Sequence, residues 1–241
     1  MNNDIQEAFE KTRAAGIIAA GALDEVAKII KPGISTNDID NLCYEFINDN
    51  DAYSAPLFYR GFPKSCCTSA NHTICHGIPG DKILTDGDII NVDVTSFKDG
   101  WHGDTSRMFY VGQVSVKAKK LIDVTYNSMM KAIKILNKEI TLGDIGSTIQ
   151  TYVEKEGFSV VRDFCGHGIG KVFHQEPNIL HYGRKGTGSK LKAGMIFTIE
   201  PMINEGVYDA KMLNDGWTAV TKDKKLSAQF EHTVGITEIG Y

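Results

Sequence analysis

The sequence predicts an α+β fold in which helices cover a sheet and the two halves of the chain resemble each other. A helix-start pattern, a His-Gly pair and a strand ending in a carboxylate each occur twice, in the same order. The 241 residues are enough for one substantial domain. Since ordered repetition of three features rarely arises by chance, we expect a single domain with an internal duplication, its halves covering roughly residues 1–115 and 116–241.

Each half carries a helix-start signal. Ile34–Ile39 reads Ile-Ser-Thr-Asn-Asp-Ile, and Ile140–Ile145 reads Ile-Thr-Leu-Gly-Asp-Ile. A Ser or Thr three residues before an Asp can satisfy the free N–H groups of a first helical turn. Apolar residues at helical spacing follow each signal. We therefore predict helices over Ile5–Ile30, Asn37–Asn48, Val116–Leu136 and Gly143–Glu156.

The strand signals also repeat. Cys75–Ile78 returns as Gly166–Ile169, both with His-Gly-Ile, and Leu84–Asp93 returns as Leu191–Glu200. Each longer copy is a turn around a glycine that leads into a β-branched run, with a carboxylate at the same late position. We predict strands over Ile89–Thr95, Thr105–Val111, Met195–Ile199 and Phe230–Ile236. Helices and strands arranged in this way favour a helix-covered sheet with a cleft between the halves.

Composition excludes several classes of protein. The net charge of −4 and the scattered Lys and Arg residues indicate neither a nucleic-acid partner nor a membrane surface. The run Ala14–Leu23 is too short to cross a bilayer, and acidic residues near the start are unlike an export signal. Five cysteines without a C-x-x-C pair indicate reduced thiols. We expect a cytoplasmic protein.

Two aspartates lie in a predicted β-hairpin around residues 90–104. A turn at Lys98-Asp99 places Asp93 opposite Asp104, whereas a turn at Asp99-Gly100 makes them diagonal neighbours on one face. Like charges so placed repel each other and need compensation. A surface hairpin with two solvated aspartates is the alternative.

Three further residues favour a metal site over that alternative. Glu200 and Glu231 end or begin apolar strands, where acids are seldom buried unless they are paired or bind metal. His167 lies between glycines, which let a ligand approach closely. A phosphate loop fits less well, because no Lys-Ser/Thr pair follows. Four carboxylates balance two divalent ions, which at about 3.5–4 Å apart can activate water for hydrolysis.

The chain resembles the type I methionine aminopeptidases of the short bacterial kind over its whole length. The matching motifs are Cys75-His76-Gly77-Ile78-Pro79, Asn91-Val92-Asp93-Val94, Asp104-Thr105-Ser106-Arg107, Cys165-Gly166-His167-Gly168-Ile169-Gly170, Phe197-Thr198-Ile199-Glu200-Pro201 and Phe230-Glu231-His232-Thr233. The resemblance implies the pita-bread fold, with two pseudo-symmetric halves around a dinuclear centre. It also implies five metal ligands, namely Asp93, Asp104, His167, Glu200 and Glu231.

The resemblance assigns further roles. Catalytic roles fall to Glu200, as proton acceptor, and to His76 and His174, which contact the substrate beside the scissile bond. The implied methionine pocket also contains Tyr59, Phe62, Cys67, Phe173 and Trp217. Phe62 and Arg60 stand where relatives often carry Tyr and His, which affects fine substrate preference. Asn71 and Ser227 are expected near a monovalent cation, and we expect structural roles for His72, His102, His181 and His232.

The function implied is removal of the initiator methionine from nascent proteins and peptides with a small second residue, through water activated by two divalent metal ions. Those ions are Co, Mn, Fe or Zn. The expected protein is a monomer whose partner is a nascent N-terminus, with transient ribosome contact compatible with this role. The alternatives are a proline-specific aminopeptidase, which usually carries an additional N-terminal domain, and a catalytically silent binding protein of the same fold.

Overall fold

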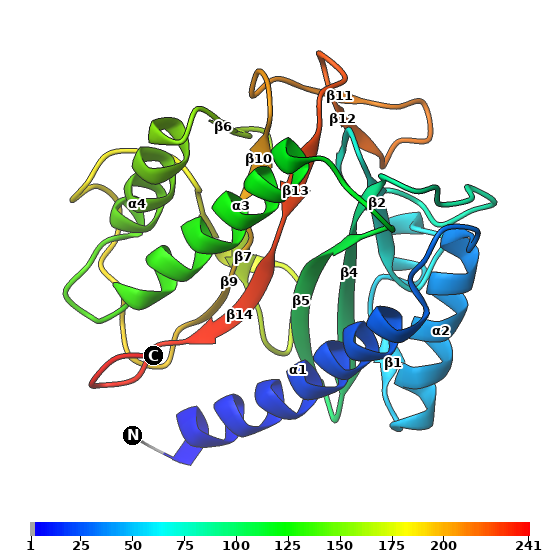
Figure 1. Ribbon diagram of the computed structural model, residues 1–241. Coiled ribbons are helices and arrows are strands. Elements are labelled where there is room, and N and C mark those ends of the chain that lie inside the picture. The colour runs from blue at the N-terminus through cyan, green and yellow to red at the C-terminus, as the bar shows by residue number, and fades with distance from the viewer. Residues whose placement is uncertain (1–2) are drawn as a thin grey trace.

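The computed structural model describes residues 3–241, in which four helices flank a mixed set of short and long strands (Figure 1). The helices are α1 (Asn3–Ile29), α2 (Thr36–Asp49), α3 (Val116–Lys134) and α4 (Leu142–Lys155). All four confirm the predicted helices to within two residues at each end. A short 3-10 turn, η1 (Tyr59–Gly61), completes the helical elements of the described chain.

The two predicted helix-start signals operate as expected. Ser35 and Thr141 each form a capping box, in which the hydroxyl accepts from the backbone of the third helical residue. In turn, the carboxylates of Asp38 and Asp144 accept hydrogen bonds from the backbone N–H groups of the capping residues, at 2.8 Å and 2.7 Å. Such reciprocal bonds satisfy two of the donors that a helix start leaves free.

A central antiparallel sheet runs in the order β1-β4-β5-β14-β9-β7-β8, with β2 paired to the side of β4. Its two longest strands, β4 and β5, form the predicted hairpin. β5 begins at Trp101 rather than at Thr105, because Trp101-His102-Gly103 lacks the β-branched signal on which the prediction depended. The strands of this sheet are β1 (Tyr53–Ser54), β2 (Cys67–Ala70), β4 (Ile89–Lys98), β5 (Trp101–Tyr110), β7 (Gly166–Gly168), β8 (Gln175–Ile179), β9 (Ile196–Ile199) and β14 (Glu231–Gly235).

Two small three-stranded sheets lie beside the central one. One has the order β13-β10-β6 and the other has the order β11-β12-β3. Their strands are β3 (Thr73–Cys75), β6 (Ser159–Val160), β10 (Met202–Asn204), β11 (Ala210–Met212), β12 (Ala219–Thr221) and β13 (Ser227–Gln229). The second of these sheets pairs β12 with β3 and so joins the two halves of the chain, whereas the first pairs strands of the second half alone.

The helices bury their apolar faces against the sheet. α1 and α3 both pass in front of the strands in Figure 1, α1 against β4 and β5 and α3 beside β9, β10 and β13. One apolar cluster lies under α1 and α2, around Leu23, Ile39 and Ile47. A second lies under α3 and α4, around Leu121 and Ile149. Each such buried aliphatic side chain contributes about 1.5–3 kcal/mol relative to an exposed one.

The contact between α1 and β5 is unusually close. A Cβ atom on Gly103 would lie 2.1 Å from the backbone nitrogen of Gly16, so only glycine allows the two backbones to meet here. Ser96 adds a hydrogen bond from its hydroxyl to the carbonyl of Ala15 at 2.6 Å. The strand residue next to Gly103, Asp104, is thereby held at a fixed distance from the helix.

No helix in the described part of the chain is long and apolar enough to span a membrane.

Candidate metal centre

The β4–β5 hairpin sets the positions of Asp93 and Asp104. Its turn is Asp99-Gly100, whose φ angles of 49° and 85° match the twist of the two strands. In the resulting register Thr95 lies opposite Asp104, and Asp93 lies opposite Ser106. The two aspartates are therefore diagonal neighbours on one face, which is the second of the two registers that the sequence left open.

The other three predicted ligands come from the strands that follow in the sheet. Glu231 opens β14 and pairs with Ser106, so it lies beside Asp104. Glu200 follows directly after β9, and His167 is the middle residue of β7. Since the sheet order is β4-β5-β14-β9-β7, five neighbouring strands each deliver one predicted ligand to the same place.

The side chains of this cluster converge. Ligand atoms of Asp104, His167 and Glu231 all lie within 4.8 Å of one another, a spacing that suits a shared metal ion. His167 Nε2 is 3.7 Å from Asp104 Oδ2 and 3.6 Å from Glu200 Oε1. Asp104, His167, Glu200 and Glu231 are all buried.

Four carboxyl groups in such a confined space cannot all ionise without a cation. Burial raises the pKa of Asp93 to about 7 and that of Glu200 to about 8. Burial, with the Asp93 carboxylate as the next cause, holds the pKa of Asp104 well above its ordinary value. Glu231 is shifted in the same direction by burial and then by Asp104. The cluster retains protons near neutral pH until a cation replaces them.

The remaining ligand candidate, His167, is held in the form that can bind metal. Burial lowers the pKa of its imidazole to about 4, so the ring is neutral near pH 7. Its Nδ1 lies 3.1 Å from the carbonyl oxygen of Gly168, to which it can donate a proton. In that tautomer Nε2 keeps its lone pair and faces the carboxylates, as in metal-binding histidines.

The donor set fits a divalent transition metal. Asp93 Oδ1 is buried and has no hydrogen-bond partner among the described residues, which is costly for a carboxylate oxygen without a cation. Oxygen ligands with a single imidazole suit Mn, Fe, Co or Zn. The unpaired oxygen and the converging donors therefore make this cluster a candidate site for a divalent metal ion.

A group of hydrogen bonds positions these ligands, and the sequence pattern did not reveal it. Thr95 donates to Asp104 Oδ1 at 2.7 Å, and Thr198 donates to Glu200 Oε1 at 2.7 Å. Buried His181 accepts the backbone N–H of Glu200 at its Nε2, at 3.1 Å. Thr95 lies two residues after Asp93 and Thr198 two residues before Glu200, and this alternate spacing on the strand face of an acid is a signal that could have identified both threonines.

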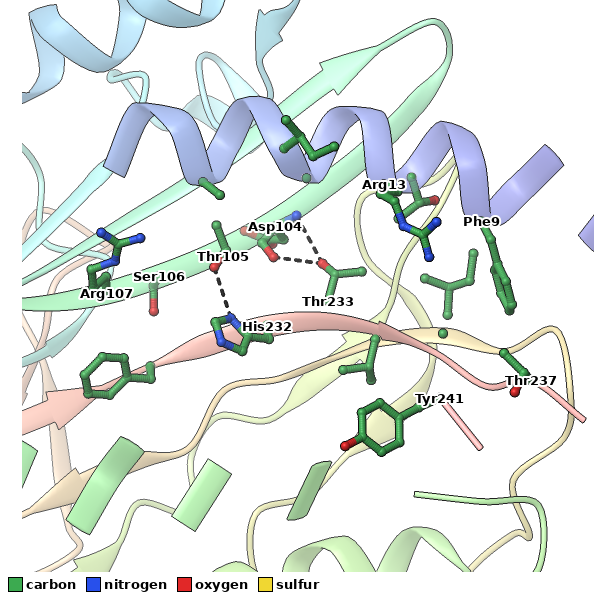
Figure 2. A pocket seen from close by; sticks show the side chains of 18 of the residues that line it. Phe9, Arg13, Asp104, Thr105, Ser106, Arg107, His232, Thr233, Thr237 and Tyr241 are labelled. Atoms are coloured by element: carbon green, nitrogen blue, oxygen red, sulfur yellow. Dashed lines mark hydrogen bonds between the residues drawn. The ribbon is translucent and has the colours of Figure 1, made fainter. Parts of the chain in front are cut away.

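The side of the strands opposite the ligands faces a groove of about 690 Å³ between α1 and β14. Figure 2 shows Thr105 and His232, which alternate with the ligand residues, turned toward this groove. Thr105 donates its hydroxyl proton to the carbonyl of Glu231 at 2.8 Å. The groove thus lies directly behind the backbone that carries Asp104 and Glu231.

The two histidines predicted to contact substrate lie on the open side of the cluster. His76 follows β3 with a left-handed φ of 55°, and its ring packs edge-on against Phe164 at 5.5 Å between centroids. His174 lies against His167, with ring centroids 4.2 Å apart. Burial lowers the pKa of His76, and burial with neighbouring positive groups lowers that of His174 to about 3. Both rings are neutral near pH 7.

A single cavity of about 340 Å³ is lined by every residue predicted to bind metal, contact substrate or take part in catalysis. Phe62 and Trp217 pack edge-on with centroids 5.2 Å apart, and Tyr59 and Phe173 lie 4.9 Å apart. An apolar chamber of this kind, open beside the carboxylates, can hold an unbranched apolar side chain. The predicted residues that line it are Tyr59, Phe62, Cys67, His76, Asp93, Asp104, His167, Phe173, His174, Glu200, Trp217 and Glu231.

Six further residues line the same cavity. The sequence predicts Arg60 only as a departure from relatives and does not predict the other five. Phe164 and Cys165 directly precede the Gly-His-Gly segment, and Met202 closely follows Glu200, so proximity to ligands was the available signal. The six are Pro56, Arg60, Thr95, Phe164, Cys165 and Met202.

Comparison with known proteins agrees with this geometry. The model of metallopeptidase family M24 matches residues 10–238, and the chain belongs to that family. Within it, the chain is 58% identical over 234 residues to the methionine aminopeptidase of Rickettsia prowazekii, covering 97% of this chain and 90% of that protein. The crystal structure of methionine aminopeptidase from Rickettsia prowazekii superposes with a TM-score of 0.96, covering 98% of this chain and 95% of the other.

A more distant neighbour shares the fold alone. Prolidase from Pyrococcus furiosus is 22% identical, with a TM-score of 0.77, and covers 97% of this chain and 62% of its own. The predicted α+β fold of the pita-bread type is thereby confirmed.

Proposed function

We propose that this protein is a methionine aminopeptidase, which hydrolyses the peptide bond after an N-terminal methionine. One observation carries the proposal: a carboxylate-rich cluster delivered by five neighbouring strands opens into the same cavity as an aromatic chamber. The cluster supplies hydrolytic chemistry, and the chamber supplies selection for an unbranched apolar side chain. Methionine, the first residue of newly made proteins, has such a side chain.

We assign the metal ligands as Asp93, Asp104, His167, Glu200 and Glu231. When bound, divalent ions would lower the pKa of a coordinated water so that hydroxide forms near neutral pH. Four carboxylates and one neutral imidazole carry a charge of −4, which two divalent ions balance. We also propose that a monovalent cation binds near Asn71 and Ser227. The backbones of these two residues meet through a hydrogen bond from Ser227 N–H to Asn71 O at 2.9 Å.

The side chains around the cluster then have separate roles in the reaction. Glu200, whose Oε1 lies 3.6 Å from His167 Nε2 within the cluster, can accept and return a proton at its carboxylate. His76 and His174 face the same cavity as neutral rings, and an N–H on each can stabilise the oxyanion that forms at the scissile carbonyl. Phe62, Trp217 and the other chamber residues hold the methionine side chain and exclude water from it.

Specificity beyond the first residue follows from crowding around the cluster. Because His76, His174 and Tyr59 surround the position of the scissile bond, the second residue must be small. We further propose that the substrate is the N-terminus of nascent polypeptides in the cytoplasm, with transient ribosome contact, and that the protein acts as a monomer.

Finally, we propose that the two halves arose by duplication. α2 and α4 each contain 14 residues and start with a capping box. The capping residues Ser35 and Thr141 each also form an isolated antiparallel bridge, to Ile83 and to Lys190 respectively. The bridge partners lie just before the two repeated turn-and-strand segments, which supports a common origin for residues 1–115 and 116–241.

The test is metal removal followed by separate addition of Mn, Fe, Co or Zn. Release of the first residue is followed from peptides that begin Met-Ala, Met-Lys and Ala-Pro. We expect metal-restored cleavage of Met-Ala alone. Cleavage of Ala-Pro would place the protein with the proline-specific peptidases, and inactivity with every metal would indicate a catalytically silent binding protein.

A further inference from the structure

The side chains of Tyr59 and His174 form a hydrogen-bonded pair inside the cavity. The Tyr59 hydroxyl oxygen lies 3.0 Å from His174 Nδ1. The two rings also pack together, with centroids 5.1 Å apart, and Phe173 packs against both. The distance does not decide which group donates the hydrogen bond. Nδ1 of a neutral imidazole can carry the proton and donate to the hydroxyl oxygen, or carry the lone pair and accept the hydroxyl proton.

The turn that presents Tyr59 is conformationally strained. Phe58 and Arg60, on either side of it, have left-handed φ angles of 64° and 47°, which non-glycine residues seldom adopt. Backbone bonds hold this shape, including Phe58 N–H to Phe62 O at 2.8 Å and Tyr59 N–H to Pro56 O at 2.9 Å. Strain of this kind persists where the surrounding structure fixes a side chain for a function.

Chemistry favours one direction for the bond. A neutral imidazole carries a single N–H, and its other ring nitrogen is an acceptor. The Tyr59 hydroxyl has no other hydrogen-bond partner within residues 3–241, so Nδ1 is the acceptor available for its proton. The imidazole proton then resides on Nε2, where it can serve as a donor.

We propose that Tyr59 donates its hydroxyl proton to Nδ1 of His174 and so holds His174 in the tautomer that carries its proton on Nε2. This proposal rests on the proposed function, because the Nε2–H donor is what the scissile carbonyl requires. In the opposite arrangement, a lone pair on Nε2 would face the carbonyl oxygen and repel it. Tyr59 is therefore a positioning residue that acts through His174.

His76 provides a contrast within the same cavity. In the described part of the chain its imidazole has ring contacts with Phe164 and Trp217 but no side-chain hydrogen bond. Neither tautomer of His76 is selected by the protein, whereas that of His174 is. We therefore assign to His174 the donor that is in place before substrate arrives.

The tautomer can be read directly by nuclear magnetic resonance. The zinc-loaded protein is labelled with ¹⁵N-histidine, and the ring nitrogens of His174 are assigned from the signals missing in His174→Gln. At pH 7.5 we expect a protonated Nε2 and an unprotonated Nδ1 in the unmodified protein. A protonated Nδ1 would overturn the proposal without any need for a variant.

Tyr59→Phe removes only the hydroxyl and retains the ring contacts with Phe173. We expect the His174 nitrogen signals to move toward an average of the two tautomers. The matched control is Tyr44→Phe on α2, an exposed tyrosine outside the cavity, which should leave them unchanged. Unchanged His174 signals in Tyr59→Phe would also overturn the proposal.

Kinetics supply an independent readout. With a Met-Ala peptide, Tyr59→Phe should lower kcat about tenfold, less than the ~10²–10³-fold cost of losing an oxyanion donor itself. KM should stay within about twofold, because binding of the methionine side chain is retained. In the His174→Gln background the same substitution should have no further effect, and additive losses would contradict the proposal. If the unmodified protein cleaves no Met-Ala peptide, the proposed function fails, while the resonance measurement still decides the tautomer.

Discussion

The hydroxyl of Thr233 hydrogen-bonds to both main-chain groups of Asp104, accepting from its N–H at 3.1 Å and donating to its carbonyl at 2.8 Å (Figure 2). β5 and β14 pair only at Ser106–Glu231 and Thr105–His232, so they diverge at this point. A side chain therefore takes the place of the missing backbone partner. It fixes the backbone of a proposed metal ligand from a residue 129 positions away in sequence.

Replacing Thr233 by Val should weaken metal binding without unfolding the protein. The substitution keeps the shape but leaves the Asp104 N–H and carbonyl unpaired, so we expect a roughly 10–100-fold rise in the Kd for the divalent ion. Isothermal titration calorimetry with Mn²⁺ measures this. Thr237→Val is the matched control, because within residues 3–241 the hydroxyl of Thr237 bonds only to the nearby N–H of Ile239. Equal affinities in both variants would show that Thr233 has no positioning role.

Stability of the metal-free protein should fall as pH rises. The folded-state pKa values of Asp93 and Glu200, about 7 and about 8, exceed the ordinary value of about 4 for these groups. Below these values the folded state keeps protons that the unfolded chain releases, and this contribution is lost as pH rises through 7 and 8. From about pH 7.5 upward, one unit above the ordinary histidine pKa, the histidines are largely neutral in both states and do not oppose the trend.

Thermal unfolding of the chelated protein between about pH 7.5 and 9 checks this sign. We expect a steady decrease in Tm, which excess Mn²⁺ abolishes because the cation replaces the protons. Metal addition at pH 7 should correspondingly release protons, detectable with an indicator dye. A Tm that rises over this range without metal would mean that the carboxylates are ionised in the apo fold.

Glu200→Gln should abolish turnover. Loss of a proton acceptor costs about 10²–10⁴-fold in rate, and the amide also removes one ligand charge. Glu205→Gln, on a residue outside the cavity that pairs with Lys117, should retain full activity. The rate of release of methionine from a Met-Ala peptide at saturating Mn²⁺ distinguishes them, and retained turnover in Glu200→Gln would remove this residue from the proposed mechanism.

Gly103→Ala should destabilise the fold and, with it, the site. The added Cβ would lie 2.1 Å from Gly16 N and 2.6 Å from the Ala15 carbonyl carbon, both of them backbone atoms that cannot move aside alone. We expect a loss of about 1–3 kcal/mol in the free energy of unfolding. Gly80→Ala, where nothing lies within 4 Å, is the control. Urea unfolding of both variants gives the comparison.

The sequence predicted the elements that have a local signal. Four helices were recognisable because apolar periodicity and capping boxes act within a few residues. The hairpin register was narrowed to two choices, and the left-handed turn at Asp99-Gly100 decides between them. Strands such as β3, β11 and β12 were not predicted, because they have only three residues each and exist through pairing across long separations.

The same division applies to the site. The four acidic ligand candidates carry a local pattern, an acid in or beside an apolar strand, and His167 carries another, its flanking glycines; the structure gathers all five into one cavity. Thr233 and His181 were missed as positioning residues because a hydroxyl or imidazole that bonds a distant backbone has no sequence periodicity. Only the paired strands bring Thr233 to Asp104, and only the fold brings His181 to the N–H of Glu200.

The placement of β14 has a consequence for biosynthesis. This strand, Glu231–Gly235, lies between β5 and β9 in the middle of the sheet, yet among the strands of residues 3–241 it is the last to be synthesised. A growing chain without it lacks Glu231 and leaves Asp104 separated from Glu200. With Glu231 as a proposed ligand, the growing chain therefore has no complete metal site until this strand joins the sheet.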